Sequence, residues 1–184
     1  MIWLILGVAL WWAAHLFKRM APARRAAMDD AGKGVVAVVL LASVVLMVIG
    51  YQRADGAVFW GRSPAMVGIN NLLMVLAFYC FGASAAKPAK VWLGTKLRHP
   101  QLTGFSLWAF AHLLVNGDVP SLILFGGLLA WALVEIAVIN AAEGPWTPPP
   151  RAPAKKEIVL LAVTVVLFAI TAGVHYWLGY PVFG

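Results

Sequence analysis

Six long apolar stretches separated by short polar connectors dominate the sequence, at 1–17, 34–51, 65–84, 102–116, 121–140 and 157–180. A helix of about 20 apolar residues crosses a hydrocarbon core of ~30 Å. Lipid offers no hydrogen-bond partners to the backbone, so even the valine-rich stretch 34–51 is predicted to be helical. The pattern predicts an all-α, polytopic membrane protein in which residues 1–184 form a single domain of six transmembrane helices.

The composition agrees with a membrane protein and narrows the function. Hydrophobic residues make up 62% of the chain and charged residues 11%, whereas soluble domains have about 25% charged residues. The net charge of +7 does not predict nucleic-acid binding, because the 14 basic residues are spread over short connectors. Cys80 is the only cysteine, which excludes an internal disulfide and a covalent C-x-x-C-H haem site.

The basic residues alternate between connectors, and this alternation predicts orientation. Cytoplasmic loops are enriched in Lys and Arg. Connectors one, three and five carry 12 of the 14 basic residues: Lys18, Arg19, Arg24, Arg25, Lys33; Lys87, Lys90, Lys96, Arg98; Arg151, Lys155 and Lys156. Connectors two and four carry only Arg53 and Arg62. We therefore predict a bacterial inner (cytoplasmic) membrane protein with both termini on the periplasmic side. No basic residue precedes the first stretch, so it is predicted to be a retained span and not a secretory signal.

Few ionisable residues lie within the predicted spans, and each is a candidate functional residue. A charged side chain near the bilayer centre costs roughly 3 kcal/mol or more. The candidates are His15, His112, Glu135 and His175. For each histidine the alternative is an interhelical hydrogen bond, for example to Asn70, Asn71 or Glu135.

Two of these histidines lie in similar sequence contexts. Segments 7–17 and 104–114 are identical at six of eleven positions, including Gly, Trp and His at i, i+4 and i+8. This spacing places the three side chains on one stripe of a helix. In each stripe the glycine exposes backbone that a flat ligand can approach, the tryptophan supplies an indole ring, and the histidine supplies a nitrogen that can bind a metal.

The two matched segments also predict a symmetry. Spans one and four run in opposite directions, so an inverted repeat of three spans each would bring His15 and His112 to one metal. Spans two and five, or three and six, show no convincing match. Because Ala, Leu and Trp are abundant in this chain, chance similarity is the alternative.

A pair of membrane histidines suits haem better than zinc. Structural zinc takes four protein ligands and catalytic zinc three, and no cysteine or carboxylate has suitable spacing here. Haem needs only one or two axial residues and an apolar slot, so we predict noncovalent haem b. Arg98, Arg24 and Arg25 could pair with its propionates, although positive-inside topology alone would also explain them. His99 is a candidate proton relay or alternative ligand. Asn116, Gly117 and Asp118 read as a helix end followed by an N-cap.

These residues together resemble a known family. The motif Arg98-His99-Pro100-Gln101, with Gly104, Trp108, Ala111-His112-Leu113 and Asn116-Gly117-Asp118 after it and Ala14-His15-Leu16 before it, is similar to the NnrU membrane family. That family includes plant-type 15-cis-zeta-carotene isomerase. The resemblance implies that His15 and His112 correspond to the haem ligands of the isomerase. It departs at Ala109, where the isomerase has a cysteine, and this departure puts isomerase activity in doubt more than haem binding.

Three functional hypotheses follow. The first, implied by the association of NnrU proteins with denitrification and nitric-oxide metabolism, is a bis-histidine haem b protein with a redox partner. The second is an enzyme, a redox-gated cis-trans isomerase of zeta-carotene or a similar membrane polyene. The third is a transporter or assembly factor without haem. In the first two, His15 and His112 ligate the iron, and the candidate cofactor contacts are Gly7, Trp11, Gly104, Trp108, Arg98, His99 and Asn116.

Overall fold

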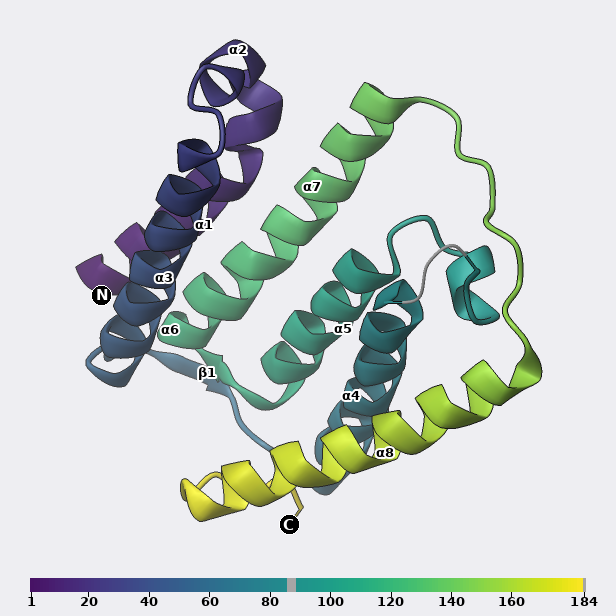
Figure 1. Ribbon diagram of the computed structural model, residues 1–184. Coiled ribbons are helices and arrows are strands. Elements are labelled where there is room, and N and C mark those ends of the chain that lie inside the picture. Colours follow the sequence, from purple (N-terminus) through teal and green to yellow (C-terminus); the bar gives the residue numbers. More distant parts are fainter. Residues whose placement is uncertain (86–88, 184) are drawn as a thin grey trace. The chain divides into compact units, whose positions relative to one another are not determined.

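The computed structural model describes residues 1–85 and 89–183 (Figure 1). Lys87, one of the basic connector residues, lies outside them. The elements in chain order are α1 (Ile2–Met20), α2 (Pro22–Ala26), α3 (Ala31–Gln52), β1 (Val58–Trp60), α4 (Pro64–Ala85), η1 (Leu93–Thr95), α5 (Pro100–Val115), β2 (Gly117–Asp118), α6 (Val119–Ser121), η2 (Leu122–Gly126), α7 (Gly127–Glu143) and α8 (Ala154–Trp177). Each predicted apolar stretch is helical, which confirms the all-α class.

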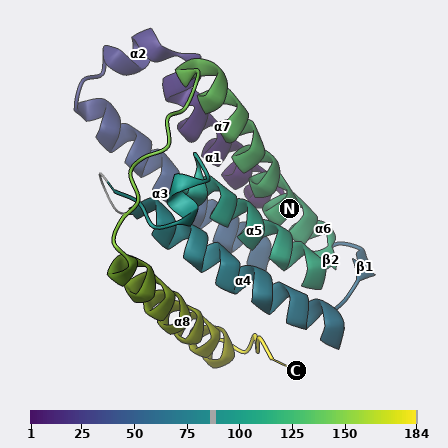
Figure 2. The same cartoon turned by 90° about the vertical axis from the view of Figure 1, so that its right-hand side faces the viewer.

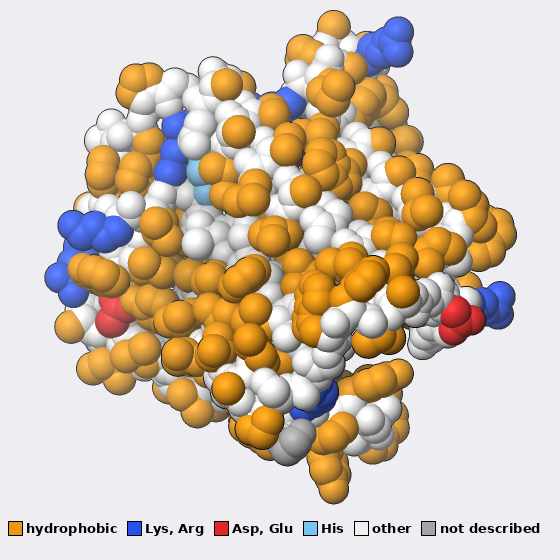
Figure 3. Space-filling view, turned by 180° about the vertical axis from the view of Figure 1, so that it is seen from behind, with side chains coloured by type: hydrophobic (Ala, Val, Ile, Leu, Met, Phe, Trp, Pro, Cys, Tyr) orange, Lys and Arg blue, Asp and Glu red, His pale blue; other side chains and the backbone are white. Residues whose placement is uncertain are grey.

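Among the described residues, five helical segments are long and apolar enough to cross a membrane: Ile2–Met20, Ala31–Gln52, Pro64–Ala85, Val119–Glu143 and Ala154–Trp177. Their outward side chains are hydrophobic; Val38, Leu41 and Val165, for example, are 67, 66 and 64% exposed. Figure 3 shows hydrophobic side chains over much of the visible surface. Lipid accepts such a surface and water does not, so the chain is a multi-pass membrane protein.

The helix at the predicted fourth span is shorter than these five. Helix α5 has 16 residues, about 24 Å at 1.5 Å per residue. Six spans were predicted from the sequence, and five helices have the length and composition to support them. The sixth crossing therefore stays a prediction.

The helices pack into two compact units. Unit 1 comprises Met1–Trp60 and Gly117–Gly144, and unit 2 comprises Gly61–Asn116 and Pro145–Gly184. Unit 1 thus holds the first, second and fifth apolar stretches, and unit 2 holds the third, fourth and sixth. The predicted inverted repeat would divide the chain after the third stretch, and the compact units do not follow that division. The repeat itself also stays a prediction.

In unit 1, α1 packs against α3 in an antiparallel pair and against α7 in a parallel one (Figure 1). Buried Ser43 of α3 donates a hydrogen bond of 2.9 Å to the Gly7 carbonyl, and the backbone of Leu4 lies directly against Gly50. On the other side of α1, Trp12 Nε1 donates to the Gly127 carbonyl at 3.0 Å. These close approaches fix the register of α1 between its two neighbours.

A short hairpin joins the two parts of unit 1 in space. Strands β1 and β2 pair antiparallel, with Val58 opposite Asp118 and Trp60 opposite Gly117. The Trp60 ring occupies the space where a side chain at residue 117 would lie, so this position requires glycine. The predicted N-cap is confirmed, because Asp118 accepts a 2.8 Å hydrogen bond from the Ser121 backbone N–H. The chain therefore leaves unit 1 after Trp60 and re-enters it at Gly117, and these two residues are paired.

The fifth apolar stretch contains an irregularity that the sequence did not predict. Residues Leu122–Gly126 form a π-helical segment between α6 and α7. Such segments are rare and frequently lie near functional sites. Trp12 donates to the carbonyl of Gly127, the first residue after this segment.

In unit 2, α4 packs against both α5 and α8 (Figure 2). The connector after α4 is held to the start of α8: Lys90 N donates to the Pro150 carbonyl at 2.9 Å, and Ala152 N donates to the Lys90 carbonyl at 2.7 Å. The carboxylate of Glu157 accepts hydrogen bonds from Tyr79 OH and from Trp92 N, the latter at 2.8 Å. These bonds hold the first turn of α8 against α4.

Candidate functional site

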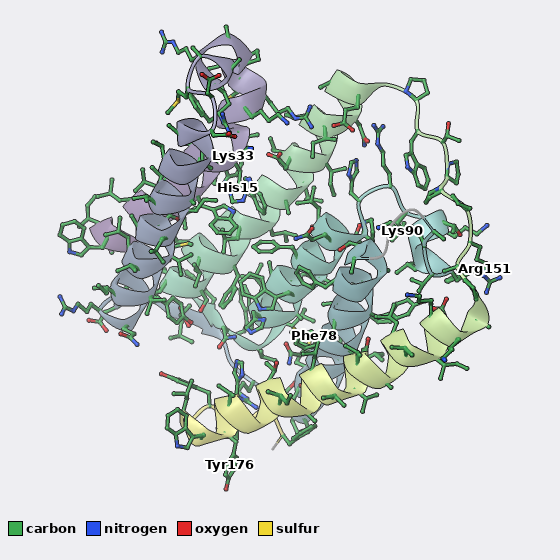
Figure 4. The ribbon with its side chains drawn as sticks, in the orientation of Figure 1. His15, Lys33, Phe78, Lys90, Arg151 and Tyr176 are labelled. Atoms are coloured by element: carbon green, nitrogen blue, oxygen red, sulfur yellow. The ribbon has the colours of Figure 1, made fainter. Side chains whose placement is uncertain are left out.

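His15 packs against two tryptophan rings within unit 1. Its ring centroid is 4.3 Å from that of Trp11 on the same helix and 4.5 Å from that of Trp131 on α7. The two indoles are in edge contact with each other, 5.3 Å apart. Figure 4 labels His15 on α1. The three rings therefore form one aromatic cluster, in which the imidazole packs against both indoles.

The hydrogen bond of His15 defines which ring nitrogen can bind a metal. Nδ1 lies 2.9 Å from the Trp11 carbonyl oxygen. A carbonyl only accepts, so Nδ1 carries the hydrogen, and in the neutral ring Nε2 keeps its lone pair. Metal-binding histidines usually donate their other N–H to a carbonyl or carboxylate in this way.

His112 on α5 of unit 2 has the same local geometry. Its Nδ1 lies 2.9 Å from the Trp108 carbonyl, and its ring centroid is 5.2 Å from that of Trp108. The similarity of segments 7–17 and 104–114 thus extends to the ring hydrogen bond. His175 on α8 makes the corresponding bond to Thr171, at 2.8 Å, and interacts electrostatically with His112. The bond alone therefore does not single out the matched pair.

The glycines of the matched stripe pack against helices. A Cβ at Gly7 would lie 2.8 Å from Met47 N and 2.9 Å from the Ser43 carbonyl oxygen of α3. A Cβ at Gly104 would lie 2.8 Å from the Ala77 carbonyl oxygen of α4. On this side both glycines bring a neighbouring helix close. Their predicted contact with a flat ligand stays a prediction.

Asn116 has a structural role. Its Nδ2 donates a 2.8 Å hydrogen bond to the His112 carbonyl, which satisfies one of the unpaired carbonyls at the end of α5. The same bond fixes the last turn of α5 around His112.

Arg98 and His99 lie at the beginning of α5. The His99 carbonyl accepts from Thr103 N at 2.9 Å and from Thr103 Oγ1 at 3.0 Å, as expected for an interfacial helix start. Along the helix, His99 is roughly 20 Å from His112 at 1.5 Å per residue. A role of His99 as an alternative ligand to an iron on His112 would need a large rearrangement.

Glu135, named above as a possible hydrogen-bond partner of a histidine, lies on the α7 face that carries Trp131. It is 9% exposed, and its Oε2 has no hydrogen-bond partner among the residues that the structure describes. Arg19 of α1 interacts with it electrostatically, while the Arg19 guanidinium forms a 2.6 Å ion pair with Glu143.

Sequence reasoning missed Trp131, which completes the surroundings of His15. A signal for it was present, because Trp131 precedes Glu135 by four residues, as Trp11 precedes His15 and Trp108 precedes His112. All three pairs put an indole one turn before an ionisable group in an apolar helix.

The described residues offer a cofactor single imidazoles and no larger cluster of metal ligands. Within residues 1–85 and 89–183, no three His, Cys, Asp or Glu side chains come together as metal ligands. Single imidazoles with a fixed Nδ1–H, set in apolar helices beside aromatic rings, fit the axial positions of a haem.

Comparison with known proteins supports the resemblance. The sequence model of the family described as "NnrU protein" matches residues 3–182. No curated protein and no solved structure matches the chain.

Proposed function

The chain belongs to the NnrU family, and on this premise we propose that it is an integral membrane haem b protein of nitrogen-oxide metabolism with His15 and His112 as axial ligands. The carrying observation is the shared geometry of these histidines: in both, Nδ1 donates to the carbonyl of a tryptophan four residues earlier and Nε2 keeps its lone pair.

The protein residues would orient and shield the cofactor. Bound haem b supplies a one-electron redox centre, which is the chemistry that nitrogen-oxide metabolism requires. The Trp11 and Trp108 carbonyls hold the imidazoles in one tautomer and one orientation. The Trp131 ring, only 3% exposed, packs on His15 and excludes water from that side.

The isomerase alternative has less support. Ala109, at the position of the isomerase cysteine, is fully buried and cannot supply a thiolate. Any isomerisation of a polyene would have to proceed without that sulfur.

We also propose six membrane crossings. The β1–β2 pairing brings residues 60 and 117 to the same end of unit 1. This pairing supports an even number of membrane crossings in the chain between them. Helix α4 has the length of a span, so α5 is assigned the return crossing despite its 16 residues; a short span is accommodated by local thinning of the bilayer.

The test is the absorption spectrum of protein purified from cells supplied with haem precursor. The wild-type protein is expected to show a low-spin b-type spectrum, which His15→Ala and His112→Ala lose. His175→Ala is the matched control, since it removes a histidine with the same ring hydrogen bond, and is expected to keep the spectrum.

Two outcomes would contradict the proposal. A folded, monodisperse preparation without a Soret band would favour the haem-free alternative. A haem spectrum that nitric oxide leaves unchanged in the reduced protein would count against direct nitric-oxide chemistry. In the second case, isomerisation of 15-cis-zeta-carotene with and without reductant would test the enzyme alternative.

A further inference from the structure

The proposed function does not use Glu135, the most deeply placed acid of unit 1. It lies on α7 two helical turns before Glu143, about 12 Å further into the helix. Its side chain is nine-tenths buried, and within residues 1–85 and 89–183 no group forms a hydrogen bond with Oε2. An ionised carboxylate in such a place is costly, because both oxygens are acceptors that need donors.

The charges along this face favour a neutral Glu135. The titratable groups of unit 1 along it are His15 and Arg19 from α1 and Glu143 on α7 itself. Arg19 already forms a 2.6 Å ion pair with Glu143. Its positive charge is therefore shared between two carboxyl groups. Arg19, Glu143 and Glu135 together carry a net negative charge when Glu135 is ionised. They are neutral together when Glu135 carries a proton.

Two charged groups that are partly exposed lie along the same helix pair as Glu135. The Arg19 side chain is 25% exposed and that of Glu143 is 46% exposed, so both lie at the aqueous end of the α1–α7 pair. Glu135 is the next acidic group inward on the same helix. Intramembrane acids at such positions are frequent members of proton relays.

We propose that Glu135 is a proton-binding residue that exchanges its proton with the aqueous side on which Arg19 and Glu143 lie. Proton uptake converts its carboxylate to the neutral acid, and release restores the negative charge beside Arg19. This function does not depend on haem and would give the α1–α7 pair a charge that responds to the aqueous pH.

The experiment uses dicyclohexylcarbodiimide, an apolar reagent that adds to protonated carboxyl groups, on the full chain in liposomes. Mass spectrometry of the wild-type protein is expected to find the adduct on Glu135, with a yield that falls as the pH rises. Glu135→Gln is expected to carry no adduct there. Asp30, whose side chain is 92% exposed, serves as the internal control and is expected to stay unlabelled.

Two variants test the charge argument. Arg19→Gln is expected to increase labelling several-fold at neutral pH, because removing a nearby cation favours the neutral acid. Glu143→Gln is expected to decrease it, because Arg19 is then released to Glu135. Equal labelling in both variants would overturn the link to the aqueous side.

Infrared spectroscopy guards against a false negative caused by poor access of the reagent. The wild-type protein is expected to show the carbonyl stretch of a protonated carboxylic acid, which Glu135→Gln lacks. If the wild type and Glu135→Gln give the same labelling and the same carbonyl band, Glu135 is ionised in the wild-type protein and the proposal is wrong.

Discussion

At the scale of single residues, the surroundings of His15 depend on a ring that comes from another helix. Trp11 fixes the tautomer through its carbonyl, and the Trp131 ring packs on the imidazole, with the two centroids 4.5 Å apart. The first contact is local in sequence and the second spans more than a hundred residues. Position and protonation of the imidazole are therefore determined by different parts of the chain.

Replacement of Trp131 tests this division. Trp131→Leu keeps an apolar side chain but removes the ring that packs on His15, so His15 gains rotational freedom. We expect about 10-fold weaker haem binding, as for other residues that orient a metal ligand, measured by haem titration of the apoprotein. Trp177→Leu, at a position 82% exposed, is the control and should bind haem as the wild type does. Equal affinities in the two variants would contradict the role of Trp131.

At the scale of elements, glycines set how closely the helices approach. Gly7 and Gly50 allow contact between α1 and α3, and Gly104 allows contact between α5 and α4. Close packing of this kind drives helix association in lipid. The hydrophobic effect does not, because lipid tails are as apolar as the helix surfaces. The helix pairs α1–α3 and α4–α5 are thus built in the same manner.

Gly104→Ala should weaken the α4–α5 pair. The added methyl group would lie 2.8 Å from the Ala77 carbonyl oxygen and 3.0 Å from Cys80 Cβ, an overpacking that typically costs about 1–3 kcal/mol. We expect a lower midpoint of thermal unfolding in detergent. Gly68→Ala in α4, with nothing within 4 Å of its Cβ, is the matched control and should be neutral or slightly stabilising. A Gly104→Ala variant as stable as Gly68→Ala would refute this packing role.

At the scale of the whole molecule, the number of crossings decides on which sides the termini lie. The hairpin of β1 and β2 favours an even number of crossings between residues 60 and 117, and the distribution of basic residues predicts that connectors one, three and five face the cytoplasm. Six crossings put both termini on the periplasmic side, whereas five would put them on opposite sides.

Reporter fusions distinguish these topologies. A periplasm-active enzyme fused to either terminus is expected to be active, and a cytoplasm-active reporter at either terminus is expected to be silent. As a control, each reporter is inserted after Arg151, in the fifth connector. There the cytoplasm-active reporter should be active and the periplasm-active one silent. Activity of opposite type at the two termini would mean that α5 does not cross the membrane.

The sequence by itself determined the helical segments, the membrane location and the matched histidines. Apolar stretches in lipid can only be helices, and their ends lie where polar or proline residues begin. For example, the span predicted at 102–116 corresponds to helix α5, Pro100–Val115. The ring hydrogen bonds of His15 and His112 are local to one helical turn, so their shared context was also visible in the sequence.

Only the tertiary structure decided which helices pack together. Helices that are apolar all round carry no amphipathic stripe to reveal their buried face, so the grouping of the first, second and fifth stretches apart from the others could not be predicted. Only the tertiary structure shows three further features. These are the π-helical segment Leu122–Gly126, the packing of Trp131 on His15, and the lack of a hydrogen-bond partner for Glu135 Oε2 among the described residues. Each depends on the fit between side chains far apart in the chain, which hydropathy does not encode.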